Sequence, residues 1–232
     1  MSRRFVLSGD LAINVHNFVV GPFQENTFLV VDPKTRNALF IDPGADPDKL
    51  IAACDELQIK PVAILNTHAH VDHVGAVSGL TQRYEIPFYL HKNEEQILSH
   101  YESACIMFGL PPGTPPVGNH WFQKEDKLVI GPFKITCIET PGHTPGGTCF
   151  RIGNHVFVGD TLFNGSVGRV DLPGGNWHAL EESLVKLFST LNGEDIIHCG
   201  HGPDTNRDQE LQQNPYIGPL QTRIRNASLL NK

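Results

Sequence analysis

The chain has 232 residues, of which 40% are hydrophobic and 19% are charged, so it is long enough to bury a large core. Its formal net charge is -7 and it contains no run of basic residues. This argues against a nucleic acid as its partner, because binding to phosphates requires clustered Lys and Arg. No apolar stretch approaches the roughly 20 residues that span a bilayer, so we expect no association with a membrane.

The five cysteines are an odd number and show no paired spacing along the chain. Reduced thiols in a cytoplasmic protein fit this pattern better than a disulfide framework does. We therefore predict a cytoplasmic location. The sequence leaves the oligomeric state open.

Short apolar runs predict strands, and an apolar period of 3.6 residues predicts helices. In chain order, the sequence predicts strands at 27–31 and 38–42, a helix at 47–57, a strand at 62–66, a helix at 74–84, a strand at 88–90 and a helix at 93–108. Strands follow at 128–130, 134–138, 148–152 and 156–158, then a helix at 177–191 and a strand at 196–198. Asp46 and Asn176 are the predicted N-caps of the first and last helices, and Gly131 and Gly153 are predicted to lie in hairpin turns.

Groups of strands with helices between them indicate a mixed α/β architecture built in layers. The sequence shows no linker, low-complexity segment or repeat. We therefore predict one domain over residues 1–232, with a short C-terminal tail from about residue 206 to residue 232.

Side chains that can bind a metal gather where the strand predicted at 62–66 ends. His68 and His70 are two residues apart in extended chain, so their side chains point the same way. Asp72 and His73 follow where a helix begins. One strand end thus brings four ligand-type side chains into a small volume.

Three later positions each place one ligand-type side chain beside glycine after a predicted strand, namely His143, Asp160 and His201. Together with the first four they supply five imidazoles and two carboxylates, which suit Zn²⁺, with Fe or Mn as alternatives. An aspartate such as Asp160 can bridge two ions, and a water held between them becomes a stronger acid. Paired histidines occur by chance, but chance does not explain the whole set.

Five segments that contain these residues resemble the metallo-β-lactamase superfamily, and the resemblance extends from about Ile13 to Tyr216. The matching segments are residues 41–44, 67–75, 141–147, 159–163 and 200–203. The resemblance implies an αββα sandwich of two mixed β-sheets flanked by helices, with the metals at one edge between the sheets.

The resemblance also implies how two divalent metal ions would be held. It assigns His68, His70 and His143 to the first ion, Asp72, His73 and His201 to the second, and Asp160 to both as a bridge. Asp42 matches an aspartate of the family that orients the loop carrying the ligands. A structural role unrelated to the metals is the alternative for Asp42.

Residues 20–27 and 163–171 are similar to the glyoxalase II-like hydrolases. Membership of that branch implies that the chain hydrolyses a small-molecule thioester similar to hydroxyacylglutathione. The attacking group would be a hydroxide that bridges the metals. Asp72 and Asp160 are candidates to accept the proton. Arg169 is a candidate to meet a substrate carboxylate, with pairing to Asp171 as its structural alternative. Asp160 stands where two-zinc antibiotic-hydrolysing members usually have Cys, which argues against a β-lactam as the physiological substrate.

The resemblance leaves the thiol carrier open. Glyoxalase II proper binds glutathione through basic residues of a helical extension, and the basic residues after Tyr216 do not match that spacing. Arg223 and Arg225 are the candidates to substitute for them.

Two other functions stay open. A persulfide dioxygenase resembles residues 168–171 and holds one iron through two histidines and one aspartate, here His68, His143 and Asp160. A non-catalytic binding scaffold is the third alternative. We expect Cys199 to be a small packed residue and His198 to be structural. His155 lacks the spacing of a ligand, and we expect it to be a surface or core residue.

Overall fold

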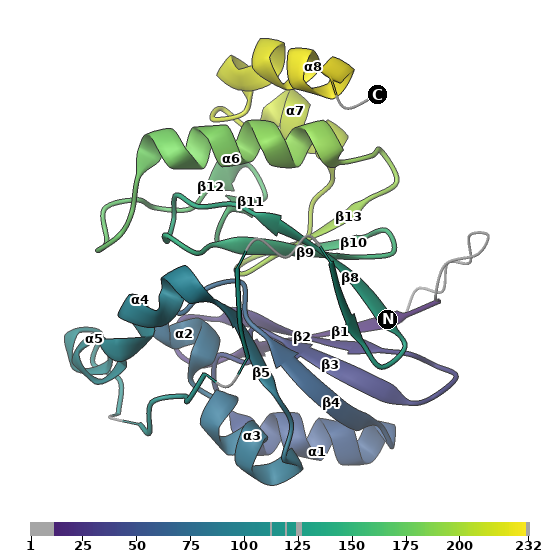
Figure 1. Ribbon diagram of the computed structural model, residues 1–232, viewed down its shortest axis with the longest axis vertical. Coiled ribbons are helices and arrows are strands. Elements are labelled where there is room, and N and C mark those ends of the chain that lie inside the picture. The colour runs from purple at the N-terminus through teal and green to yellow at the C-terminus, as the bar shows by residue number, and fades with distance from the viewer. Residues whose placement is uncertain (1–11, 112, 119, 124–126, 231–232) are drawn as a thin grey trace.

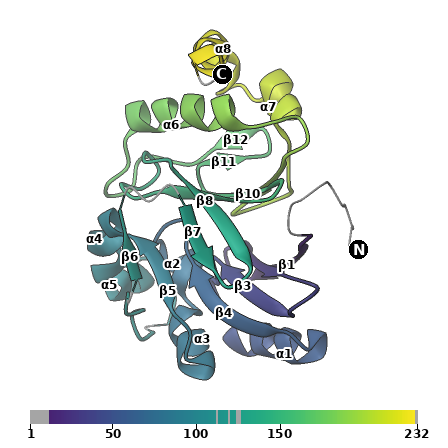
Figure 2. The same cartoon turned by 45° about the vertical axis from the view of Figure 1, so that its right-hand side comes forward.

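The computed structural model describes residues 12–111, 113–118, 120–123 and 127–230. Two β-sheets face each other, and helices cover the outer face of each sheet (Figures 1 and 2). The predicted αββα sandwich is confirmed. The predicted domain of residues 1–232 includes two ends, 1–11 and 231–232, that lie outside the described residues.

The first sheet has six strands, paired in the order of the chain. They are β1 (Asn14–Val20), β2 (Glu25–Val31), β3 (Asn37–Ile41), β4 (Lys60–Leu65), β5 (Phe88–His91) and β6 (His120–Phe122). The first two pairs are antiparallel and the next three are parallel. Helix α1 (Pro47–Leu57) joins β3 to β4, and α2 (Val71–Val74) with α3 (Val77–Tyr84) joins β4 to β5. Parallel pairing brings the carboxyl ends of β3, β4 and β5 to one edge.

The second sheet has the order β13-β10-β9-β8-β7. Its strands are β7 (Lys127–Ile130), β8 (Phe133–Glu139), β9 (Thr148–Ile152), β10 (His155–Gly159) and β13 (Ile196–Cys199), and a small ribbon of β11 (Leu162–Phe163) and β12 (Ser166–Val167) follows β10. Helix α6 (Trp177–Thr190) covers its outer face, and α7 (Arg207–Gln213) and α8 (Gln221–Leu230) lie beyond it (Figure 1). Gly131 and Gly153 have φ of 54° and 60° in the two hairpins, as predicted.

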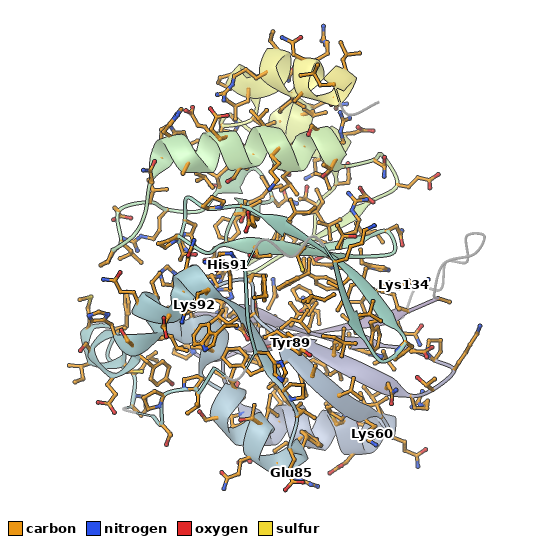
Figure 3. All side chains as sticks on the ribbon, viewed as in Figure 1. Lys60, Glu85, Tyr89, His91, Lys92 and Lys134 are labelled. Atoms are coloured by element: carbon orange, nitrogen blue, oxygen red, sulfur yellow. The ribbon has the colours of Figure 1, made fainter. Side chains whose placement is uncertain are left out.

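Apolar side chains fill three layers. Phe28 and Phe157 meet edge to face between the sheets. Leu50 and Leu80 are buried against the first sheet, and Phe188 of α6 is buried against the second. In Figure 3, Lys60 marks the amino end of β4, whereas His91, at the carboxyl end of β5, lies toward the second sheet. The carboxyl edge of the first sheet is therefore the edge that faces the second sheet's loops.

Two predicted helices are interrupted. The helix predicted at 74–84 begins earlier, at Val71, and breaks at Gly75. A Cβ on Gly75 would lie 2.3 Å from the carbonyl oxygen of Gly44, and the Ala76 amide donates to Pro43 instead of continuing the helix. The helix predicted at 93–108 is instead η1 (Lys92–Glu94), α4 (Glu95–Ser99) and α5 (Tyr101–Met107).

One predicted cap is confirmed and one is wrong. The Asn176 side chain accepts a hydrogen bond from the Ala179 amide at the start of α6. Asp46 makes no side-chain cap; its carboxylate accepts from the Gly21 amide, 3.1 Å away, and so joins α1 to the loop after β1.

Strands β1, β6, β11 and β12 and the two C-terminal helices were not predicted. Helices α7 and α8 lie in the segment predicted as a tail, and Ile224 of α8 is buried in the cluster under α6. Across the described ranges, every helix is too short or too polar to cross a bilayer. All five cysteines are buried, and none forms a disulfide.

Candidate metal centre

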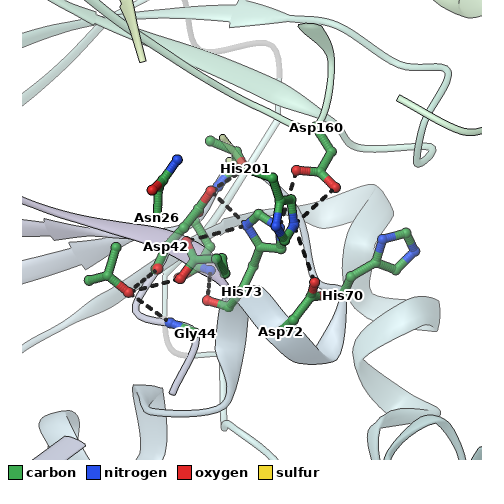
Figure 4. A network of polar contacts seen from close by, with 12 residues as sticks. Asn26, Asp42, Gly44, His70, Asp72, His73, Asp160 and His201 are labelled. Atoms are coloured by element: carbon green, nitrogen blue, oxygen red, sulfur yellow. Dashed lines mark hydrogen bonds and ion pairs between the residues drawn. The ribbon is translucent and has the colours of Figure 1, made fainter. Parts of the chain in front are cut away.

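The seven predicted ligands meet where loops after strands of both sheets converge. Figure 4 labels His70, Asp72, His73, Asp160 and His201 among them. The turn after β4 carries His68 and His70, and α2 carries Asp72 and His73. The remaining three come from the second sheet, with His143 between β8 and β9, Asp160 after β10 and His201 after β13.

The first ligand set is a cluster of imidazoles. His68, His70 and His143 each offer a ring nitrogen within 4.8 Å of the others. Nε2 of His143 lies 2.9 Å from Nδ1 of His70. Three ring nitrogens directed at one point are a favourable donor set for a borderline divalent ion.

The second ligand set contains a carboxylate. Asp72, His73 and His201 offer ligand atoms within 4.8 Å of one another. Nε2 of His201 lies 3.3 Å from Oδ2 of Asp72.

Asp160 contacts both sets. Figure 4 shows it beside His73 and His201 of the second set. Its Oδ2 lies 3.6 Å from Nε2 of His143 in the first set and 3.7 Å from Nε2 of His201 in the second. Its Oδ1 lies 3.3 Å from Nε2 of His73. A single carboxylate therefore stands between the two clusters.

Three of the imidazoles have their tautomer set by an oxygen acceptor. In each case Nδ1 faces a carboxylate or carbonyl oxygen, which can only accept, so Nδ1 carries a hydrogen and Nε2 is the ring nitrogen turned toward the centre. These pairs are His73 with Asp42 at 3.1 Å, His143 with the Arg169 carbonyl at 2.7 Å, and His201 with the Phe23 carbonyl at 3.2 Å.

The surroundings of His68 show whether the site suits a metal ion. Its Nδ1 lies 3.0 Å from Oγ1 of Thr67, while its buried Nε2 has no hydrogen-bond partner in the described part of the chain. A buried polar atom without a partner is costly, and a metal ion would satisfy this one. The residues present therefore fit divalent ions.

The protonation states of several ligand side chains also favour the binding of metal cations. Burial, together with the neighbouring imidazoles, lowers the pKa of His68 well below its usual value and that of His70 to about 4, so both rings are neutral and can coordinate. Burial raises the pKa of Asp160, but the charges of His73 and His143 outweigh it and hold that pKa far below its usual value. Asp160 is thus a carboxylate in a buried site.

Asp42 supports the ligands and is not aimed at the centre. It also lies near His68 and His73, but its two oxygens accept hydrogen bonds of 2.6 Å from the amide and the hydroxyl of Thr67. Oδ2 in addition faces Nδ1 of His73. Asp42 thereby fixes the turn that carries His68 and the orientation of the His73 ring.

Glu94 was missed by the sequence analysis. Its side chain is 0% exposed and accepts hydrogen bonds from the amide of Ala69, at 2.8 Å, and from that of Gly146, at 2.6 Å. Ala69 stands between two ligands and Gly146 lies three residues after His143. Glu94 therefore ties two ligand loops together. No local signal marks it, because its partners are 25 and 52 residues away.

Asn26 holds the third ligand loop. Its side-chain amide donates to the carbonyls of Cys199 and Gly202, at 2.9 and 2.8 Å, on either side of His201. Gly200 has to be small, since a Cβ there would lie 2.3 Å from Oδ1 of Asp160. Asn26 lies in a segment that carried the family resemblance, but its role was not predicted.

The side chain of Arg169 is engaged with its neighbour. Its Nε and one terminal nitrogen each lie 2.7 Å from an oxygen of Asp171, which is the structural alternative considered for it. The guanidinium is largely exposed at the rim of the site, while the backbone carbonyl of Arg169 orients His143.

Cys199 is fully buried, and burial raises the pKa of its thiol, as expected for a packed residue. His198 is buried, as expected for a structural residue, and it contacts His155. Nδ1 of His155 lies 2.9 Å from Nε2 of His198, whose Nδ1 lies 3.0 Å from Asp204. Strands β10 and β13 pair in parallel and bring these histidines together.

A cavity of about 240 Å³ opens over the ligands. His70, Asp72, His143, Asp160 and His201 form its floor, and mostly apolar side chains form its walls. A site that combines ligand-type polar groups with apolar walls is typical of a small-molecule pocket.

Known proteins resemble the chain over most of its length. The probable metallo-hydrolase YqgX of Bacillus subtilis is 35% identical over 202 residues, which cover 85% of this chain and 94% of that protein. Hydroxyacylglutathione hydrolase GloC of Haemophilus influenzae is 34% identical over 211 residues, with coverage of 88% and 98%.

Solved structures agree with the fold. BLEG-1 B3 metallo-β-lactamase has a TM-score of 0.82 at 35% identity, covering 88% of this chain and 99% of its own. TTHA1623, in a di-iron-bound form, has a TM-score of 0.80 at 39% identity, with coverage of 87% and 99%. ETHE1 from Myxococcus xanthus has a TM-score of 0.74 at 25% identity, with coverage of 94% and 91%.

The family model of the metallo-β-lactamase superfamily matches residues 20–201, which include all seven predicted ligands. The match spans most of the chain and agrees with the fold and with both curated relatives. The chain belongs to the metallo-β-lactamase superfamily.

Proposed function

We propose that the chain is a metal-dependent hydrolase that cleaves a small-molecule thioester at a centre of two divalent ions, Zn²⁺ or else Fe or Mn. The observation that carries this proposal is the position of Asp160 between the two ligand sets, within 3.7 Å of Nε2 of His143, His73 and His201. A carboxylate so placed suits two ions better than one. The relative named as a hydroxyacylglutathione hydrolase supports the choice of a thioester.

In this proposal His68, His70 and His143 would hold one ion, Asp72, His73 and His201 would hold the other, and Asp160 would be a ligand shared by both. When bound, such ions polarise a carbonyl group and make a water molecule acidic enough to act as a nucleophile near neutral pH. The protein needs no Ser or Cys nucleophile, in agreement with the buried, protonated thiol of Cys199.

The chain's own residues orient the site and handle the proton. The hydrogen bonds to Nδ1 of His73, His143 and His201 keep each Nε2 turned toward the centre. Asp72 and Asp160 are the carboxylates proposed to take a proton from the attacking water. Of the two, the Asp72 side chain is more exposed, at 21% against 12%. Arg169 contributes through its carbonyl, since its guanidinium is held by Asp171.

A second candidate function is a mononuclear iron persulfide dioxygenase. His143 lies 3.6 Å from Asp160 and its ring lies 4.9 Å from that of His68, so the three ligands of such an iron are also together. The structure of ETHE1 matches across 94% of this chain. One iron per chain and oxygen consumption would distinguish this function from hydrolysis.

The test is to load the purified protein with Zn²⁺, Fe²⁺ or Mn²⁺ and assay S-lactoylglutathione, an N-acetylcysteamine thioester, glutathione persulfide with an oxygen electrode, and a chromogenic cephalosporin. The last substrate is included because one similar structure is named a B3 metallo-β-lactamase. We expect thioester hydrolysis that His68→Ala abolishes and that His178→Ala, which removes an exposed histidine, leaves intact. Oxygen uptake or cephalosporin hydrolysis without thioester turnover would overturn the proposal.

A further inference from the structure

Seven apolar residues line the cavity above the predicted ligands. They are Phe23, Ala69, Val71, Ile97, Ala104, Phe108 and Leu172. They come from the β1–β2 loop, the turn after β4, α2, α4, α5 and the segment after β12, so the apolar character does not depend on one element. A substrate group that enters this cavity loses its contacts with water and gains contacts with apolar side chains on several sides.

Two of these residues form an aromatic pair at the mouth. The rings of Phe23 and Phe108 are 5.9 Å apart and nearly perpendicular, at 84°. Both remain more than one-third exposed, at 39% and 38%, and each also lines the cavity. The Phe23 carbonyl accepts from Nδ1 of His201, so the backbone that carries this ring is fixed beside the ligands.

The cavity offers no free Lys or Arg side chain. Arg169 is the one Lys or Arg among the described residues that line it, and its guanidinium is bound by both oxygens of Asp171. Arg223 and Arg225, the candidate substitutes for the glutathione-binding residues, do not line the cavity, and Arg223 pairs with Glu182 of α6. The two carboxylates of a glutathione conjugate would therefore find no unpaired Lys or Arg here.

We infer that the group accommodated by this cavity is apolar and uncharged, so that the substrates favoured are thioesters of alkyl or aryl acids on a small neutral thiol. This inference rests on the proposed function, whose substrate class it narrows. Burial of one methylene contributes about 0.8 kcal/mol, or about fourfold in an equilibrium constant. We therefore expect kcat/KM to rise about fourfold per methylene until the cavity is filled.

The test compares acetyl, butyryl and hexanoyl N-acetylcysteamine and S-lactoylglutathione as substrates of the metal-loaded protein. The inference predicts rising kcat/KM along the acyl series and a lower value for S-lactoylglutathione than for the hexanoyl thioester. Phe108→Ala should lower the ratio of hexanoyl to acetyl kcat/KM at least threefold. Met107→Ala removes a side chain that is 74% exposed and outside the cavity, and should leave that ratio unchanged.

A binding measurement separates this inference from the proposed function. Calorimetry with S-methyl and S-hexyl N-acetylcysteamine, which are thioethers and cannot be hydrolysed, reports the apolar site without turnover. Tighter binding of the S-hexyl compound, weakened by Phe108→Ala, supports the inference even if no thioester is cleaved. Equal binding of both thioethers, or a preference for S-lactoylglutathione, overturns the inference while leaving thioester hydrolysis standing.

Discussion

Nδ1 of His73 lies 3.1 Å from Oδ2 of Asp42, and both side chains are buried. The same carboxylate accepts from the amide and hydroxyl of Thr67, next to His68. Through these contacts one residue that is itself not directed at the metal centre determines how two predicted ligands point. Loss of a partner of this kind typically costs about 10- to 100-fold in metal affinity or activity.

Asp42→Asn should weaken metal binding about 10- to 100-fold, because the amide cannot accept from Thr67 and His73 as the carboxylate does. Asn tolerates the left-handed backbone at this position, where φ is 49°, so the fold should persist. Competition with a chromogenic chelator measures the affinity. Asp48→Asn, an exposed substitution on α1, is the matched control. Equal affinities of the two variants would show that Asp42 does not orient the ligands.

Glu94→Gln should destabilise the protein by about 2 kcal/mol, since a buried carboxylate that accepts two amide hydrogen bonds loses one acceptor. The loops of His70 and His143 would then be less firmly joined, so metal affinity should fall as well. Urea unfolding measures the first effect and chelator competition the second. Glu95→Gln changes the exposed neighbouring carboxylate, which pairs with Lys92, and should cost less than about 0.5 kcal/mol. Equal stability of the two variants would contradict the role of Glu94.

Removal of the metals should lower the melting temperature. An ion present at 100 times its Kd stabilises the folded state by about 2.7 kcal/mol. Each kcal/mol shifts the Tm of a protein of this size by about 2–4 °C. We therefore expect chelation to lower Tm by about 5–10 °C, as followed by circular dichroism. His201→Ala should show a smaller drop, since it impairs one of the two sites. A Tm that chelation leaves unaltered would argue that the ligand cluster does not bind metal.

The stability of the protein should depend on pH through His155, which is not one of the predicted metal ligands. Burial and the nearby His198 lower the pKa of His155 to about 4, below the value of 6.5 in an unfolded chain. The unfolded chain therefore takes up the proton first, so the contribution of a neutral His155 is complete above pH 6.5 and is lost as the pH falls toward 4. Asp204, beyond His198, opposes this shift without cancelling it.

His155→Asn keeps a polar group near the position of Nδ1 but does not titrate. In metal-free protein, its free energy of unfolding should fall less steeply than that of the unsubstituted chain between pH 7 and pH 4. His178→Asn, at an exposed position, controls for the loss of an imidazole. Parallel pH profiles for all three proteins would rule out this linkage.

Elements with a clear apolar period could be predicted, and those without one could not. Helix α1 has the predicted bounds because one face of the segment is apolar and the other is charged. Strand β1 was missed because Asn14, His16 and Asn17 interrupt its apolar pattern. Helix α8 buries only Ile224 among its described residues and so lacks an amphipathic stripe. Helix α8 packs on α6, and this tertiary contact cannot be predicted from the sequence of α8 alone.

The ligands themselves could be predicted because His68, His70, Asp72 and His73 fall within one strand-to-helix turn. Their division between two ions depended on the family resemblance and stays a proposal. The residues that support them could not be predicted in the same way. Glu94 and Asn26 act on backbone groups far away in the sequence, and only the folded chain brings those groups to them.

The most direct test of a two-metal centre is anomalous diffraction from crystals of the metal-loaded protein, collected on both sides of the Zn, Fe and Mn absorption edges. The proposal predicts two peaks about 3.5–4 Å apart, one beside His68, His70 and His143 and one beside Asp72, His73 and His201, with Asp160 between them. A single peak held by His68, His143 and Asp160, or no peak at these residues in fully loaded protein, would contradict it.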